Sequence, residues 1–272
     1  GCFLWATDSI VREFSPDVIQ VVGQSTTEAI YTFYEQQATT FLRALNDLPP
    51  EELPDVIEDF FRLTTDVILY HPSKLLLSPL LPPILSAAST SLTLLKEEPL
   101  IATLHFLRDF LAYGSPDAPA SSFDPDGQYR PRPNPPELQN SVLSHLTVTP
   151  QSSPDTPSLG ESLLQRCLTG MMFSFPADCF PDSSGVLLSL FQLLPQETSH
   201  WIAHTLQLLP PGSVAEQEKE RLLRNLHQRV ESGEVRKVRG LLQDFTNAYR
   251  RRNVAPREGL GRLEGGRFRF SG

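Results

Sequence analysis

Histidines and cysteines are the residues of this sequence that could ligate a metal or act as nucleophiles. His200 and His204 are four residues apart, so on a helix they would share one face and could contact one ion. Zinc needs at least a third protein ligand, and no His-Glu-x-x-His pattern supplies one. Cys167 and Cys179 match no metal-ligand spacing and, like Cys2, lie among apolar residues. We therefore expect solvated histidines, buried cysteines, no metal and no cofactor.

Motifs that bind phosphate or activate a serine are also missing from the sequence. It contains no Gly-x-Gly-x-x-Gly, no phosphate-binding Gly-Lys-Ser/Thr loop and no Gly-x-Ser-x-Gly elbow. We assign no catalytic residue and expect a protein that is not an enzyme.

Clustered carboxylates are the stronger chemical feature. Six of them fall within 13 residues that contain no base: Asp47, Glu51, Glu52, Asp55, Glu58 and Asp59. The helical period places Asp55, Glu58, Asp59 and Asp66 opposite an apolar stripe, on one exposed side. One interpretation is a solvated helix face whose carboxylates complement the helix dipole. The other is a docking surface for an Arg-rich protein segment, because carboxylates accept paired hydrogen bonds from guanidinium groups.

Basic residues gather at the other end of the chain. Residues 1–215 carry a net charge of −15 and residues 216–272 carry +6, which together give −9. The acidic part should repel nucleic acid, so a basic protein is the better partner and direct nucleic-acid binding is not expected. Arg250, Arg251 and Arg252 could contact phosphate or end a helix. The run 257–269 resembles a short RNA-binding segment, although a disordered tail is the simpler interpretation.

A repeated helix positions the acidic cluster. Residues 52–70 and 99–113 carry the same apolar scheme at an offset of 43 residues, and their ends match as Asp66 to Tyr70 and Asp109 to Tyr113. This period is typical of HEAT or armadillo helix pairs, which must stack to bury their apolar stripes. Asp244 and Tyr249 echo the same ending. Such arrays mostly bind other macromolecules.

The remaining segments extend this pattern into an all-α superhelix without strands. Prolines are expected mainly in the connections, with Pro72 and Pro195 ending helices. Asp182 and Ser213 are expected to cap the helices that follow them. The predicted organisation is HEAT-like pairs over 1–113, a mobile insertion over 114–136, further HEAT-like helices over 137–252 with a break at 147–158, and a basic Gly/Arg tail over 253–272. Seven prolines lie in the 23 residues of the insertion.

The start of the chain suggests a piece of a longer array. It opens at Gly1, and the apolar residues Leu4, Trp5, Ile10 and Val11 already form one helix face that needs a preceding neighbour. No run approaches the ~18 uninterrupted apolar residues of a membrane span, so no membrane partner is expected.

Four stretches carry a resemblance to a known family: Cys2-Phe3-Leu4-Trp5 with Ile10-Val11 and Glu13, Pro54 to Leu63, Phe106 to Leu111, and Leu241 to Asn247. In this order and spacing they resemble the C-terminal region of importin-β-type nuclear transport receptors. The most similar branch is the transportin-SR or importin-13-like one, with its fungal members.

The resemblance implies a HEAT-repeat receptor whose N-terminal arm receives Ran-GTP and whose C-terminal arm receives cargo. Cargoes of this branch are RNA-binding proteins with Arg-Ser or Arg-Gly-rich segments, so the six carboxylates become candidate cargo-binding residues. Interaction with nucleoporins and shuttling between cytoplasm and nucleus are expected from the family. The family's Ran-binding repeats and its Arg-rich helix for phosphoserines have no counterpart in this sequence. Two other interpretations remain: a helical scaffold without a transport role, and an RNA-binding module that uses the basic C-terminus.

Overall fold

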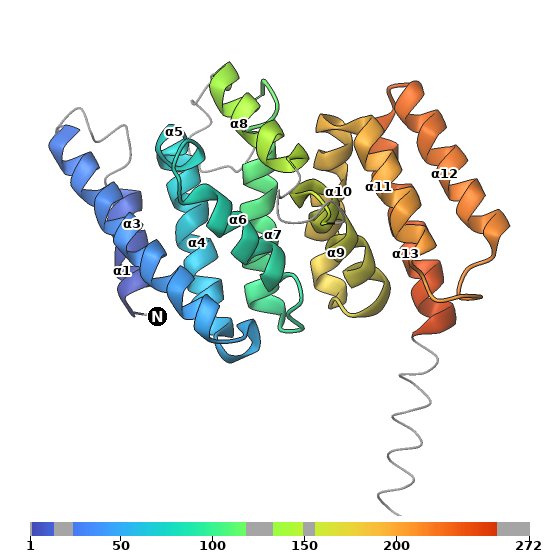
Figure 1. Cartoon of the computed structure of the whole chain (residues 1–272), viewed down its shortest axis with the longest axis horizontal. Helices are drawn as coiled ribbons and strands as arrows, with labels where there is room; N and C mark the ends of the chain where they lie inside the picture. Colours follow the sequence, from blue (N-terminus) through green and yellow to red (C-terminus); the bar gives the residue numbers. More distant parts are fainter. Residues whose placement is uncertain (1, 14–23, 118–132, 149–155, 255–272) are drawn as a thin grey trace, which may run out of the picture. The chain divides into compact units, whose positions relative to one another are not determined.

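The computed structural model describes residues 2–13, 24–117, 133–148 and 156–254 of the chain. Over these residues the chain forms α-helices and short 3-10 turns, and it forms no strand (Figure 1). By their internal packing the residues divide into two compact units, Gly1–Leu163 and Leu164–Gly272. We describe each unit by itself.

The first unit consists of two rows of helices. In one row α4 packs against both α1 and α7, and in the other α3 packs against α6 and α5 against α8. The bounds are α1 Cys2–Glu13, α3 Gln24–Asp47, η1 Pro50–Glu52, α4 Pro54–Tyr70, α5 Pro72–Leu76, α6 Leu81–Ser91, α7 Glu97–Ala112 and α8 Pro136–Thr147. The two copies of the repeated helix, α4 and α7, are therefore neighbours in the same row.

Aromatic rings fill the core between α3, α4 and α7. Phe41 stacks on Phe60 with ring centroids 3.9 Å apart, and Phe61 lies 5.4 Å from Phe106. Phe110 extends the series 6.5 Å beyond Phe106. Each of these rings is buried, so the apolar area removed from water is large and the ring pairs add specific edge and face contacts.

The repeated ending of α4 and α7 is a buried feature. Asp66 and Asp109 are only 7% and 6% exposed, and the hydroxyl of Tyr113 donates to the carbonyl of Ile68 at 2.9 Å. The predicted echo at the end of the chain is only partial, because Tyr249 is buried but Asp244 is exposed. The aspartate there stands one residue further from its tyrosine, which turns it about 100° around the helix.

Prolines begin helices in this protein more often than the sequence suggested. Pro54, Pro72, Pro136 and Pro195 are the first residues of α4, α5, α8 and α11. The predictions that Pro72 and Pro195 end the preceding helices are therefore incomplete, since each residue also starts the next one. The first helical position suits proline, because its φ is already helical and its missing N–H would have had no partner.

The two predicted caps are wrong. α10 begins at Phe180, so Asp182 lies inside the first turn, and α12 begins at Glu216 with Ala215 before it. The hydroxyl of Ser213 instead donates to the carbonyl of Pro210 at 2.7 Å. In each case the helix starts at a different residue from the one that propensity favours.

The second unit is built from α10 and α13, which pack together, with α11 and α12 beside them. The bounds of its elements are α9 Leu159–Phe173, which crosses into this unit, η2 Ala177–Cys179, α10 Phe180–Leu193, α11 Pro195–Gln207, α12 Glu216–Glu231 and α13 Val235–Asn253. Ser184 joins α10 to α13, because its hydroxyl oxygen accepts from Arg239 Nε and Gln243 Nε2, both at 2.9 Å.

Asn134 forms hydrogen bonds between the two segments that flank residues 118–132. Its Nδ2 donates to the carbonyls of Ala112, Ser115 and Asp117 at 3.2, 2.8 and 2.7 Å. Its backbone N–H donates to Pro116 at 2.8 Å. Asn134 is 6% exposed, so these hydrogen bonds come from a buried amide and hold the segment after α7 against the segment before α8.

The predicted mobile insertion, break and tail fall largely outside the described residues, at 118–132, 149–155 and 255–272. At the start of the chain, Leu4 and Val11 are buried as expected. Trp5 and Ile10, expected on the same face, are 71% and 39% exposed.

Candidate functional site

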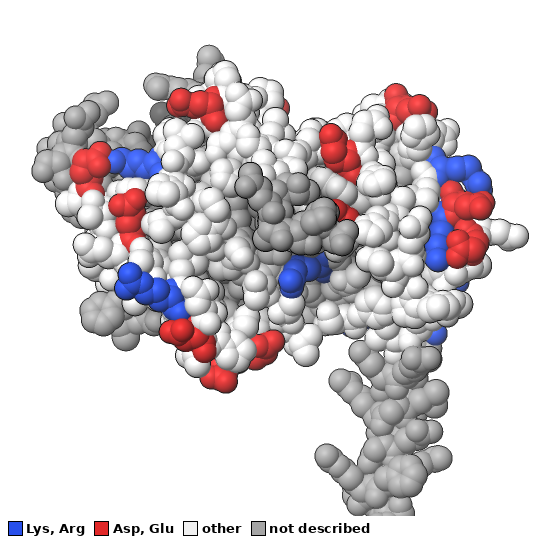
Figure 2. All heavy atoms as spheres, in the orientation of Figure 1, with Lys and Arg blue, Asp and Glu red and all other residues white. Residues whose placement is uncertain are grey.

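The six candidate carboxylates lie along one turn and the helix ends that it joins. Asp47 is the last residue of α3, Glu51 and Glu52 belong to η1, and the other three lie in the first turns of α4. We call the set Asp47, Glu51, Glu52, Asp55, Glu58 and Asp59 the acidic edge. Figure 2 shows acidic side chains gathered where the turn between α3 and α4 lies in Figure 1.

Prolines shape the turn that presents the acidic edge. Pro49 has an extended backbone, with φ −65° and ψ 148°, and Pro50 and Pro54 begin η1 and α4. Leu53 between them is half-buried and anchors the turn. Carboxylates near helix N-termini complement the exposed N–H groups, so the turn tolerates this density of negative charge.

Exposure divides the acidic edge into two parts. Asp47, Glu51, Glu52 and Asp55 are exposed, and the side chain of Asp55 is 79% accessible. Glu58 and Asp59 are half-buried, and the side chain of Glu58 is 18% accessible. The carboxylates most accessible to a partner are thus at the turn rather than along α4.

Two basic side chains of the same unit already bind the acidic edge. Lys96 Nζ lies 2.6 Å from Asp55 Oδ1, and Arg62 Nη2 lies 2.7 Å from Glu58 Oε1, one turn away on α4. The hydrogen bond to Asp55 raises the pKa of Lys96, with smaller contributions from Glu98 and Glu58. Both pairs are open to solvent on at least one side, where such pairs contribute little stability and can exchange partners.

The first turn of α7 extends the acidic edge beyond the predicted residues. Glu97 and Glu98 follow Lys96 directly, and Glu98 is exposed. Glu98 stands 43 residues after Asp55, so the repeat offset relates the two carboxylates. Sequence reasoning missed Glu98, although the offset could have found it.

Asp66 does not belong to the exposed side on which it was predicted. It is buried, and its Oδ2 accepts a 2.6 Å hydrogen bond from Arg12 Nε on α1. The reason is tertiary, because α1 covers this end of α4.

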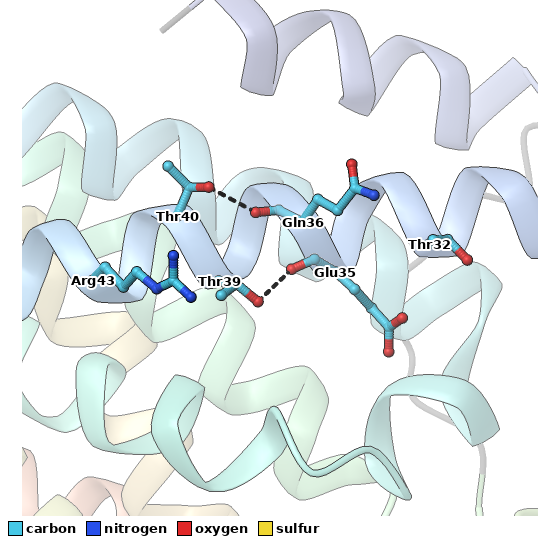
Figure 3. A pocket seen from close by; sticks show the side chains of 6 residues that line it. All are labelled: Thr32, Glu35, Gln36, Thr39, Thr40 and Arg43. Carbon is cyan, nitrogen blue, oxygen red and sulfur yellow. Dashed lines mark hydrogen bonds between the residues drawn. The ribbon is translucent and has the colours of Figure 1, made fainter.

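A groove on α3 offers no chemistry of its own. Polar side chains of this single helix line it, as Figure 3 shows: Thr32, Glu35, Gln36, Thr39, Thr40 and Arg43. The hydroxyls of Thr39 and Thr40 donate to the carbonyls of Glu35 and Gln36, one turn earlier, at 2.8 and 2.9 Å. Both hydroxyls therefore donate their hydrogen bonds within their own helix.

The histidines and cysteines lie where the sequence placed them. His200 and His204 are exposed on α11, and the described residues include no group of three or more possible metal ligands. Cys167 and Cys179 are buried as thiols rather than disulfides, and burial raises the pKa of Cys167 to about 12. A thiol held protonated in this way is a poor nucleophile. The side chain of Cys2 lies outside the described residues.

The arginines at the end of α13 are largely used within the fold. Arg250 Nη1 donates to the carbonyl of Phe175 at 2.8 Å, and its guanidinium lies 5.6 Å from the ring centre of Phe180. Arg252 makes two hydrogen bonds to Glu218, at 2.9 and 2.6 Å. Arg251 is exposed, and its Nε donates to the carbonyl of Asn247 in its own helix at 3.3 Å. Arg250 and Arg252 therefore have partners within the fold.

No protein-family model matches the chain. Individual proteins do match it: the chain is 33% identical over 264 residues to an uncharacterized protein of Schizosaccharomyces pombe, covering 96% of the chain and 25% of that protein. It is 24% identical over 269 residues to the mRNA transport regulator MTR10 of Saccharomyces cerevisiae, covering 94% of the chain and 26% of that protein. The chain thus spans about a quarter of the length of these relatives.

Among solved structures, the fold matches importin13 in its cytosolic state. The TM-score is 0.57 at 15% identity, over 91% of this chain and 24% of that one. The predicted fold class, an all-α array of HEAT-like helix pairs, is confirmed. Among the described residues, no helix combines the length and apolarity needed to cross a membrane.

Proposed function

We propose that this chain is a segment of an importin-β-family nuclear transport receptor of the transportin-SR or importin-13-like branch, and that it binds protein cargo. The proposal rests on its similarity, over 94% of its length, to a protein named as an mRNA transport regulator. The fold shared with importin13 agrees with it. In the complete receptor, Ran-GTP would bind through an N-terminal part outside this segment. Nucleoporins would also be partners of the receptor, and the protein would shuttle between cytoplasm and nucleus.

The acidic edge is the surface that we assign to cargo. Four exposed carboxylates lie close together on one turn, so an Arg-rich segment could contact several of them at once: Asp47, Glu51, Glu52 and Asp55. Guanidinium donates two parallel N–H groups to one carboxylate, which lysine cannot do. The segment expected is of the Arg-Ser or Arg-Gly type. Glu58 and Asp59 would support the site from its half-buried side.

The internal partners of the acidic edge suit exchange with an incoming arginine. The ammonium group of Lys96 binds Asp55 as a point charge, and half of the Lys96 side chain is exposed. Replacing this contact by a bidentate arginine pair costs one weak surface ion pair and gains a stronger one. The same carboxylates would give the complex a steep dependence on salt.

A non-enzymatic role agrees with the described chemistry. Cys167 is buried, and burial raises its pKa to about 12, so this thiol stays protonated and is a poor nucleophile. An RNA-binding role is less well supported, because Arg250 and Arg252 are held by Phe175, Phe180 and Glu218.

A binding titration tests the function. Fluorescence anisotropy should show that a labelled Arg-Ser peptide binds the chain and that the affinity falls as salt rises. An unlabelled RNA of similar length should not compete, with or without residues 250–272. Failure to bind Arg-Ser and Arg-Gly peptides would support a scaffold without this cargo. RNA binding that depends on residues 250–272 would support the nucleic-acid alternative.

A further inference from the structure

The contact between α1 and α4 contains two carboxylates and one guanidinium. Arg12 Nε lies 2.6 Å from Asp66 Oδ2 and 3.3 Å from Asp8 Oδ2. Asp8 is four residues before Arg12 on α1, whereas Asp66 comes from α4. The side chains of Asp8 and Asp66 are 16% and 10% accessible. One N–H group therefore faces two largely buried acids.

The ion pairs of this cluster set one positive charge, that of Arg12, against two acids. With both carboxylates charged, its net charge would be −1 in a site mostly removed from water, which is costly. Asp8 Oδ1 is buried and has no hydrogen-bond partner among the described residues. A single proton placed between the acids removes the net charge and supplies a donor.

We propose that Asp8 and Asp66 share one proton beside Arg12, and that the docking of α1 on α4 weakens when this proton is lost. The shared proton makes the stability of the contact between α1 and α4 depend on pH. The cluster lies apart from the acidic edge and does not depend on the function proposed for that surface.

The net effect of the groups around Asp66 favours its protonated form. Burial raises the pKa of Asp66, Asp8 also raises it and Arg12 lowers it, and together they move this pKa from 3.8 to about 7. Tyr70 lies near Arg12 on α4. On α7, the buried Asp109 is the acidic residue that corresponds to Asp66 in the repeat, and it is not among the groups that shift the pKa of Asp66.

The sign of the pH effect follows from the position of the proton. When α1 leaves, Asp66 returns toward its ordinary pKa of 3.8 and releases the proton. Stabilisation from the cluster is therefore greatest at low pH and is lost as pH rises through about 7. His71, beyond the end of α4, acts in the opposite sense, because burial lowers its pKa and its protonation opposes folding.

Hydrogen exchange of the α1 amides in the whole chain tests the proposal. Protection factors, corrected for the intrinsic pH dependence of exchange, should fall by about tenfold per pH unit below pH 7 and level off above it. Asp66→Asn should remove this slope, and Asp8→Asn should move it to lower pH. Asp244→Asn, an exposed aspartate on α13, should leave it unchanged.

Carbon-13 NMR of the side-chain carboxyls supplies a second readout that does not need Asp66→Asn to fold. In the wild type, Asp66 should titrate near pH 7, and in Asp8→Asn its midpoint should fall by more than about one unit because the second acid is gone. An unchanged midpoint in Asp8→Asn, or the same α1 protection at pH 6 and pH 8 in the wild type, would overturn the proposal.

Discussion

Lys96 Nζ lies 2.6 Å from Asp55 Oδ1, so a cation of the chain itself occupies the most exposed carboxylate of α4. Lys96 comes from the connection before α7, and Asp55 from the first turn of α4. The pair crosses between neighbouring repeats at the place where we expect an arginine of the partner to bind.

Removing this internal cation should strengthen cargo binding. Lys96→Ala frees Asp55 and removes one positive charge from the acidic edge, so affinity for an Arg-Ser peptide should rise by about two- to fivefold, the range of a weak surface pair. Anisotropy at low salt measures this. Lys237→Ala is the matched control, because the side chain of Lys237 is 59% accessible and pairs with Glu234 at the start of α13. Equal effects of the two variants would show that only net charge matters.

The predictability of the acidic edge from sequence was limited by tertiary contacts. Helical periodicity placed Asp55 and Asp66 on the same outward side of α4, and within the isolated helix this is reasonable. Arg12, 54 positions earlier, binds Asp66, and α1 buries it. Lys96, 41 positions later, reaches Asp55. No local pattern contains either contact.

Helix existence was easier to predict than helix ends. The apolar stripes of α4, α7 and α13 follow from the 3.6-residue period, and the 43-residue offset correctly made α4 and α7 repeats. Helix starts were harder to predict, because a proline can mark the end of one helix or the beginning of the next. Pro72 and Pro195 stop one helix and open the next within one or two residues, so sequence alone shows a boundary but not its direction.

Asn134 should stabilise the corner that flanks residues 118–132. Asn134→Ala removes three hydrogen bonds of its buried Nδ2 and leaves the three accepting carbonyls without this donor, so the chain should lose about 1–3 kcal/mol of unfolding free energy. Urea denaturation measures the loss. Asn140→Ala, at an exposed position of α8, serves as control and should change stability little. Equal stability of the two variants would contradict a fastening role for Asn134.

Gly170 should be required by the close packing of Phe175. A Cβ at residue 170 would overlap the Phe175 ring, whose backbone N–H also bonds to the Gly170 carbonyl at 2.7 Å. We expect Gly170→Ala to destabilise the chain by about 1–3 kcal/mol through overpacking. Gly240→Ala is the control, because its Cβ would meet nothing within 4 Å and alanine favours the helix. A neutral Gly170→Ala in thermal or urea unfolding would show that Phe175 can move aside.

The central claim is that the acidic edge binds an Arg-rich partner, and charge reversal at its exposed turn tests it most directly. The variant is Glu51→Lys, Glu52→Lys and Asp55→Lys. Glu58 is left intact because it pairs with Arg62 within α4, and a lysine there would also disturb the helix. The matched control reverses three exposed acids in the first turns of other helical segments: Glu137→Lys, Asp178→Lys and Glu197→Lys.

The decisive measurement is the affinity of both triple variants for one Arg-Ser peptide across a salt series, with circular dichroism to verify folding. The acidic-edge variant should bind at least about tenfold more weakly than the control at low salt, and its affinity should depend less on salt. Equal affinity and equal salt dependence of the two folded variants would contradict the assignment of this surface to cargo.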